Sequence, residues 1–174
     1  MGQHIAFLRG VNVGKRTTPM ARLKALAEDL GYSDVWTHIN SGNVVFSASG
    51  KRADLEDQLE TCFVAEFGFV VETFVRTAAE LQAVGAARPF TVADGHTHMV
   101  TFFRHPATPA QVAALEGLSN GTDTLVVGGR EVHWRIRGTV MTSELKAKDW
   151  AGTGIGPSTS RNLTGVRKLL AKLD

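Results

Sequence analysis

The hydrophobic and polar pattern over the first 76 residues predicts the order β-α-β-β-α-β. Short apolar or alternating runs indicate strands, whereas apolar residues recurring every three or four positions indicate helices. We expect strands at residues 5–8, 34–39, 44–46 and 69–76, and helices at residues 19–30 and 51–67. Residues 40–43, Asn-Ser-Gly-Asn, have the composition of a turn, so the second and third strands form a hairpin. This order of elements is typical of a ferredoxin-like fold.

The remainder of the chain repeats this pattern in part. Capping boxes that begin at Thr77 and Thr108 each open a helix, and strands are expected at residues 98–103, 125–127 and 132–137. A short helix at residues 143–150 completes the order β-α-β-β-α, which is one strand short of a second copy. Residues 151–160 are interpreted as a Gly/Ser/Thr loop before a last amphipathic helix that starts at Asn162.

We therefore predict an α+β protein with two ferredoxin-like lobes, residues 1–76 and 77–174, in which helices pack on one face of each antiparallel sheet. The chain has 174 residues, of which 43% are hydrophobic and 21% are charged, as is ordinary for a globular protein. The single cysteine, Cys62, indicates a reducing compartment, and no apolar run reaches the length of a membrane helix. We expect a cytoplasmic protein without membrane contact.

The charge is unevenly distributed, although the formal net charge is only +2. Five cations and no acid lie between Arg9 and Lys24, whereas five acids and no base lie between Asp54 and Glu66. The cationic region includes the loop after the first strand, with Gly10, Asn12, Gly14 and Lys15. A strand–loop–helix with such residues is suited to hold an anion at the helix N-terminus. Only three residues separate Gly10 from Gly14 and Arg16 follows Lys15, so neither a P-loop nor a dinucleotide fingerprint is present.

Two further polar stretches are candidates for the same site. Ser41 and Asn43 lie at the predicted hairpin tip, which we expect at the opposite end of neighbouring strands from the first loop. Arg161 and Asn162 lie at the start of the last helix, where a cation opposes the helix dipole. An internal ion pair or an anionic ligand would each explain Arg161, and turn chemistry alone would explain Ser41 and Asn43.

Other polar clusters give weaker hypotheses. His133, Arg135 and Arg137 alternate along one strand and form a basic row, but the row lacks the aromatic residues with which RNA-binding sheets stack bases. His96, His98 and His105 are too few and too poorly placed to predict a metal site. No catalytic set is recognisable, and His38 is the best weak candidate for a general base. We expect no metal and no cofactor.

Three stretches together resemble a known family. They are residues 8–14 (Leu-Arg-Gly-Val-Asn-Val-Gly), 39–46 (Ile-Asn-Ser-Gly-Asn-Val-Val-Phe) and 159–162 (Thr-Ser-Arg-Asn) with the closing helix. Their order and separation resemble the bacterial family called domain of unknown function 1697. The resemblance implies a small cytoplasmic protein with two ferredoxin-like lobes and no established activity. The family's characteristic positions fall on Arg9, Gly10, Asn12, Val13, Gly14, Ser41, Gly42, Asn43, Arg161 and Asn162.

Our main hypothesis is a basic polar cleft that binds a phosphate- or carboxylate-bearing small molecule, nucleotides included. Its expected ligand-binding residues are Arg9, Gly10, Asn12, Gly14, Lys15, Ser41, Asn43, Arg161 and Asn162. One alternative is a single-stranded nucleic-acid binding module that uses the basic loop and row. Another is a protein-interaction module without a small-molecule ligand, which exposed tryptophans at positions 36, 134 or 150 would favour. The oligomeric state and any reaction are left open.

Overall fold

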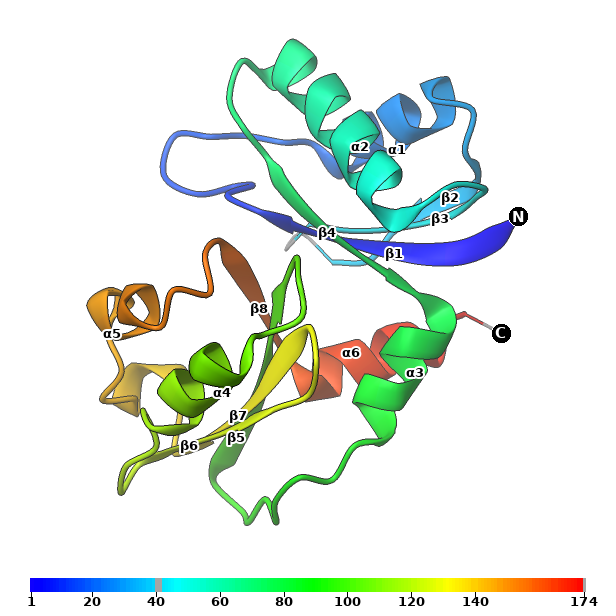
Figure 1. Ribbon diagram of the computed structural model, residues 1–174. Helices are drawn as coiled ribbons and strands as arrows, with labels where there is room; N and C mark the ends of the chain where they lie inside the picture. The colour runs from blue at the N-terminus through cyan, green and yellow to red at the C-terminus, as the bar shows by residue number, and fades with distance from the viewer. Residues whose placement is uncertain (40–41, 174) are drawn as a thin grey trace. The chain divides into compact units, whose positions relative to one another are not determined.

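The structure, a computed structural model, describes residues 1–39 and 42–173. The chain divides into two compact units, Met1–Gln82 and Ala83–Lys172, and each contains a four-stranded antiparallel sheet (Figure 1). Both sheets have the strand order of a ferredoxin-like fold, so the predicted α+β class with two such lobes is confirmed. Asn40 and Ser41 of the predicted turn lie outside the described residues.

The first unit has a hydrophobic core between one face of its sheet and two helices. The sheet has the order β2-β3-β1-β4. The elements are β1 (Gly2–Arg9), α1 (Met20–Asp29), β2 (Ser33–Thr37), β3 (Asn43–Ala48), α2 (Arg52–Phe67) and β4 (Glu72–Thr77). Alternate strand residues such as Leu8 and Phe46 pack in one core with Leu23 of α1 and with Leu59 and Phe63 of α2. The hydrophobic period thus decides which residues enter this core, although β1, β3 and β4 are buried on both of their faces.

Strand β1 ends beside the starts of its two neighbours. Because β1 is antiparallel to both β3 and β4, Phe7 lies opposite Asn43 and Arg9 lies opposite Glu72. The backbone nitrogen of Leu8 also donates to the carbonyl of Gly42 at 2.8 Å. The expectation that the first loop and the hairpin tip lie at opposite ends of their strands is therefore wrong, since the end of one antiparallel strand meets the start of the next.

The second unit repeats the topology with the order β6-β7-β5-β8. Its first elements are β5 (His96–Phe103), α4 (Pro109–Glu116), β6 (Asp123–Val127) and β7 (Glu131–Arg137). Strand β8 (Ser158–Asn162) pairs with β5 and supplies the fourth strand. This corrects the interpretation of residues 151–160 as a loop and the conclusion that the second copy lacks a strand. The edge strand is Ser/Thr-rich and has no apolar alternation, so its pairing, rather than its pattern, makes it a strand.

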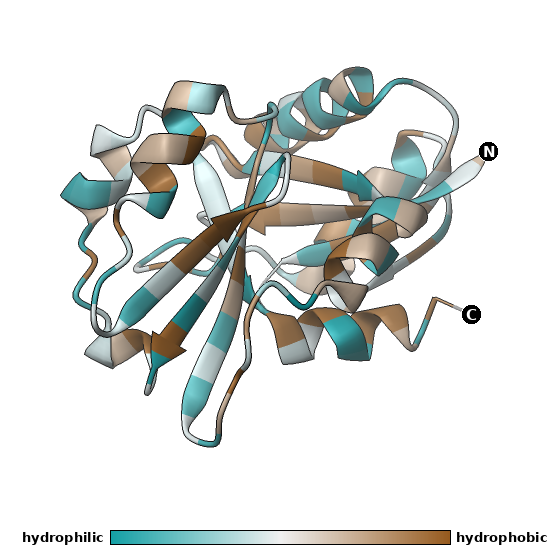
Figure 2. Cartoon of the chain, turned by 60° about the horizontal axis from the view of Figure 1, so that its bottom comes forward, coloured by the Kyte–Doolittle hydropathy of each residue, from teal (hydrophilic) through white to brown (hydrophobic). Residues whose placement is uncertain are grey.

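Helices cover both faces of this second sheet. A 3₁₀ turn (Val140–Thr142) and helix α5 (Ala147–Gly152) replace the predicted helix at residues 143–150. Leu118, Leu145 and Trp150 pack with Trp134 and Ile136 on one face. Helix α6 (Leu163–Leu170) contacts β5 and β8, and it also meets the C-terminal end of α3 (Ala78–Ala86). Its amphipathic pattern is visible as brown and teal bands on the helix that precedes the C-terminus (Figure 2).

Candidate functional site

The loop after β1 is closed by its own asparagine. Asn12 adopts a φ of 51°, and its Oδ1 accepts hydrogen bonds from the backbone nitrogen (2.9 Å) and hydroxyl (3.2 Å) of Thr18. Thr18 is therefore part of the loop and does not cap the first helix. Helix α1 instead begins at Met20, with Pro19 as the N-cap residue. Gly10 and Gly14 have φ values of 78° and 61°, which glycine adopts readily.

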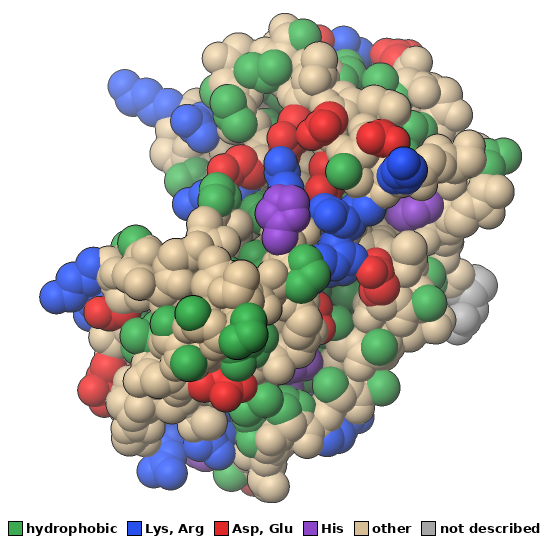
Figure 3. Space-filling model, in the orientation of Figure 1, with side chains coloured by type: hydrophobic (Ala, Val, Ile, Leu, Met, Phe, Trp, Pro, Cys, Tyr) green, Lys and Arg blue, Asp and Glu red, His purple; other side chains and the backbone are tan. Residues whose placement is uncertain are grey.

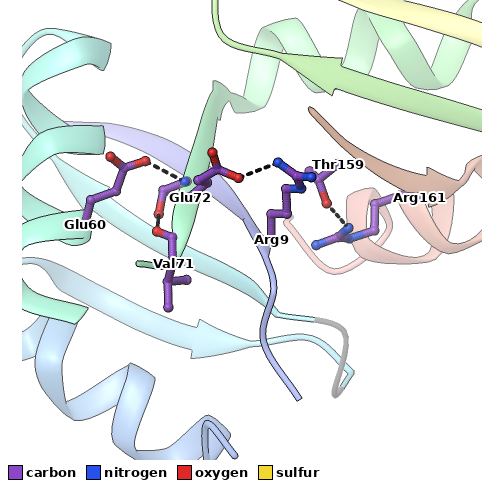
Figure 4. A network of polar contacts seen from close by, with 7 residues as sticks. Arg9, Glu60, Val71, Glu72, Thr159 and Arg161 are labelled. Atoms are coloured by element: carbon purple, nitrogen blue, oxygen red, sulfur yellow. Dashed lines mark hydrogen bonds and ion pairs between the residues drawn. The ribbon is translucent and has the colours of Figure 1, made fainter. Parts of the chain in front are cut away.

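Two cations of this loop region, Arg9 and Arg16, have partners within the first unit. Arg9 Nη1 donates to Glu72 Oε2 at 2.6 Å (Figure 4), and the guanidinium of Arg16 lies 4.7 Å from the centre of the Phe69 ring. Lys15 is exposed. On the face of the first unit seen in Figure 3, acidic side chains gather with basic ones among them. The loop is thus part of a mixed-charge surface.

The hairpin tip contributes two closely fitted residues. Gly42 has a φ of 78°, and a Cβ at this position would lie 2.5 Å from Val11 Cγ2 and 3.1 Å from Leu8 Cβ. Asn43 is 3% exposed, and its Nδ2 donates to the carbonyl of His38 at 2.8 Å. Ser41 lies outside the described residues. Two of the three characteristic stretches therefore meet in the first unit, where Asn12 and Asn43 hold the backbone of their own loops.

The third stretch lies in the second unit and differs from expectation. Arg161 belongs to strand β8, and Asn162 is the N-cap of α6, accepting from the backbone nitrogen of Thr164 at 2.9 Å. The expected conflict between Arg161 and the helix dipole is therefore wrong, because the helix begins after Asn162. Arg161 Nη1 donates to Thr159 Oγ1 at 2.8 Å (Figure 4) and to the carbonyl of Ser160 at 2.9 Å. Burial lowers the pKa of Arg161 to about 10.

A cavity of about 580 Å³ lies in the second unit, beside the start of α6. Its polar lining comes from Arg88, His96, His98, Asn162 and Arg167, and its apolar lining comes mainly from Phe90, Val92 and Leu163. None of the described residues that line it is an aspartate or a glutamate. A site with this lining is complementary to a negatively charged group.

Both arginines of the cavity are anchored on the C-terminal end of α3. Arg88 Nη1 donates to the carbonyls of Gly85, Ala86 and Ala87 at 2.9–3.1 Å, and Arg167 Nε donates to Gly85 O at 3.0 Å. The last carbonyls of a helix lack intrahelical partners and carry partial negative charge, so they attract cations. In the described part of the chain, neither arginine forms an ion pair, and the Nη atoms of Arg167 make no hydrogen bond. Burial and repulsion by Arg88 lower the pKa of Arg167.

Two histidines lie hydrogen-bonded on the same sheet face. The Nε2 atom of His98 lies 2.9 Å from the Nδ1 atom of His133, and the ring of Phe90 lies 4.7 Å from the His98 ring, measured between centroids. Burial, followed by the charges of His133, Arg167 and Arg88, lowers the pKa of His98 to about 4. Burial and the charge of Arg167 lower the pKa of His133. Both rings are therefore neutral near pH 7 in the unliganded protein.

The basic row on β7 (His133, Arg135 and Arg137) is not an exposed surface on which bases could stack. His133 is 4% exposed, and Arg135 donates to Thr124 Oγ1 at 2.6 Å while its guanidinium lies 5.6 Å from the centre of the Phe90 ring. The alternation of the row was predicted, but the contact of Phe90 with Arg135 was not. Similarly, none of the three tryptophans is exposed. His38 is also buried, at 8% exposure.

Sequence reasoning found Asn162 but missed the two cavity arginines. Arg88 belongs to none of the characteristic stretches, and Arg167 lies in the closing helix but is not one of the characteristic positions. Only the C-terminal end of α3 brings the two arginines together. His96 and His98 were noticed as metal candidates, yet among residues 1–39 and 42–173 no group of three or more histidine, cysteine, aspartate or glutamate side chains is arranged to hold a metal ion. No helix in these ranges has the length and apolar character needed to cross a bilayer.

Comparison with known proteins gives a family and a structural neighbour. No curated protein matches the chain. A solved structure, described as that of the conserved bacterial protein SP0830 from Streptococcus pneumoniae, is 24% identical with a TM-score of 0.78, and the match covers 99% of each chain. At this identity the likeness supports the fold alone. A family described as "Protein of unknown function (DUF1697)" matches residues 1–133, which is most of the chain. The chain therefore belongs to the DUF1697 family, as the three characteristic stretches suggested.

Proposed function

We propose that this protein binds an anionic small molecule, bearing a phosphate or a carboxylate, in the cavity of its second unit. The main observation behind this proposal is that Arg88 and Arg167 line the same cavity, whose described lining contains no carboxylate. Two like charges held together at the end of a helix repel each other, and an anion between their guanidinium groups would relieve that repulsion. No reaction is assigned to the site.

Further features of the lining support a ligand with both a charged and an apolar part. The hydroxyl of Thr164 and the amide of Asn162 lie at the N-terminus of α6, where the helix dipole favours negative charge. The Nδ1 atom of His96 is buried and has no hydrogen-bond partner among the described residues. Phe90, Val92 and Leu163 supply apolar surface for the body of an organic ligand.

This proposal moves the anion site away from most of the residues that the sequence suggested. Of that set, only Asn162 lines the cavity. Arg9, Asn12 and Asn43 have hydrogen-bond partners within the first unit, and a role for them in ligand binding stays a prediction. Cytoplasmic location likewise stays a proposal, supported by the single cysteine.

Calorimetric titration with phenyl phosphate and with benzoate tests the proposal. We expect one or both to bind the wild-type protein, and Arg167→Gln to weaken that binding by about 10-fold or more, since a hydrogen bond to a charged group contributes about 1.5–3 kcal/mol. Lys168→Gln is the matched control, because it removes the same charge from the next position of α6 without altering the cavity lining.

Two results would contradict the proposal. One is the absence of binding of either probe to the wild-type protein. The other is an equal loss of affinity in Arg167→Gln and Lys168→Gln, which would indicate a diffuse electrostatic effect. Arg167→Lys keeps the charge but loses the planar fork, so we expect it to bind with intermediate affinity.

A further inference from the structure

The hydrogen bond between His98 and His133 constrains how many protons the two rings can carry. In the 2.9 Å contact between Nε2 of His98 and Nδ1 of His133, one nitrogen donates and the other accepts. One extra proton on the pair preserves this hydrogen bond, because the neutral ring still accepts from the charged one. A second extra proton would place two donors face to face and break it. The pair is therefore able to hold one proton, and its titration belongs to both rings together.

The charged groups around the pair oppose that proton. Arg88 and Arg167 face His98 across the cavity, and β5 and β7 alternate so that other charged or titratable side chains share the sheet face. These others are His96, Glu131, Arg135 and Arg137, with Arg161 on the neighbouring strand β8. Only Glu131 among them is acidic, and it lies two residues from His133. The excess of positive charge disfavours an imidazolium, in keeping with the lowered pKa of His98.

A bound dianion would cancel the positive charge of the cavity that disfavours an imidazolium, whereas a bound monoanion would cancel only part of it. Arg88 and Arg167 together carry two positive charges, which a phosphate monoester dianion cancels and a carboxylate only halves. The three terminal oxygens of a phosphate also offer more acceptors to the guanidinium groups, the Thr164 hydroxyl and His98 than the two oxygens of a carboxylate. The cavity volume of about 580 Å³ leaves space for an organic group beyond the phosphate.

We propose that the cavity takes up a phosphate monoester together with a proton, which the hydrogen-bonded His98–His133 pair holds. This inference rests on the proposed anion site and names its ligand class and its regulation. Binding and protonation are thermodynamically linked, so the ligand that favours the proton is itself bound more tightly when the proton is present. Affinity for a dianionic ligand then rises as the pH falls from 8 towards 6.5.

Calorimetry at pH 6.5, in two buffers with different ionisation enthalpies, measures the protons taken up when phenyl phosphate binds. Part of the phenyl phosphate is singly protonated at pH 6.5 and releases its proton when it binds as the dianion, so the informative quantity is the difference between proteins. We expect wild-type uptake to exceed that of His98→Asn by about half a proton or more per bound ligand. His105→Asn is the matched control, since this exposed loop histidine lies outside the cavity, and it should match the wild type. We also expect phenyl phosphate to bind at least about 10-fold more tightly than benzoate, which corresponds to about 1.4 kcal/mol.

The possible failures can be told apart. Equal uptake by wild-type and His98→Asn proteins, with binding intact, overturns the proton linkage but leaves the anion site. Equal affinity for benzoate and phenyl phosphate overturns the ligand class. Absence of binding overturns the proposed function as well. Should His98→Asn not fold, the histidine ring-proton NMR shifts of the wild-type protein decide, because ligand addition must move the signals of His98 and His133 towards the charged form.

Discussion

At the scale of single residues, several polar side chains that look functional instead form hydrogen bonds that stabilise the fold. Asn12 and Asn43 each bond to the backbone of their own loop. Asp123, which is fully buried, accepts from Trp134 Nε1 (2.7 Å), Ser143 Oγ (2.8 Å) and the backbone nitrogen of Glu144 (2.9 Å). Such bonds satisfy donors that would otherwise be buried without partners. An amide in a characteristic stretch is therefore weak evidence for ligand contact.

Gly42 is constrained both by its backbone angle and by its neighbours, so Gly42→Ala should destabilise the protein by about 3 kcal/mol. Gly68, at the end of α2, is the matched control, because its φ of 74° is nearly the same while a Cβ there would meet nothing within 4 Å. Gly68→Ala should cost only about 1 kcal/mol. Urea unfolding measures both changes. Equal losses would show that Val11 and Leu8 move aside without cost.

At the scale of elements, local signals were recovered and non-local ones were missed. The capping boxes at Thr77 and Thr108 are present as predicted, since each needs only residues three positions apart. Strand β8 was missed because only its pairing with the distant β5 makes it a strand. The candidate site was missed for the same reason. Arg88 and Arg167 both donate to Gly85 O because α6 packs against α3, and no local sequence pattern encodes that contact.

Helix α2 protects the outer edge of the first sheet, and this suggests a test. Glu60 Oε1 accepts from the backbone nitrogen of Thr73 at 2.7 Å, and Glu56 Oε1 accepts from that of Val75 at 2.9 Å, both on the edge strand β4. Glu60→Ala should cost about 1–2 kcal/mol, because it leaves a part-buried amide without its acceptor. Glu60→Gln retains an acceptor and should cost less than half as much. Hydrogen exchange at the Thr73 amide should accelerate in Glu60→Ala alone; unchanged exchange would mean that the Glu60 carboxylate does not protect this amide.

At the scale of the whole molecule, two units of one topology carry different chemistry. In the first unit, Arg9 and Arg22 are neutralised by Glu72 and Glu66. In the second, Arg88 and Arg167 lie beside neutral histidines and have no carboxylate partner in the described chain. The second helix of the repeat also differs, with 16 residues in α2 and six in α5. A shared fold therefore predicts neither the position of a site nor its charge, which depend on the side chains that each unit adds.

The histidine pair should make the stability of the unliganded protein depend on pH. Because the pKa of His98 falls from 6.5 to about 4 on folding, the unfolded chain binds more protons between these values. The free energy of unfolding should then be highest above pH 6.5 and fall by on the order of 2 kcal/mol as the pH drops to about 4, with His133 acting in the same direction.

Denaturation by urea, followed by tryptophan fluorescence at several pH values from 4.5 to 7.5, measures this slope. His98→Asn should flatten it, whereas His105→Asn, which alters an exposed histidine on a loop, should leave it unchanged. Glu66, whose pKa is lowered by its hydrogen bond with Arg22, loses its contribution mainly below pH 4.5 and so does not produce the slope. Equal slopes in both variants would mean that other groups set the acid sensitivity, and that folding does not lower the pKa of His98.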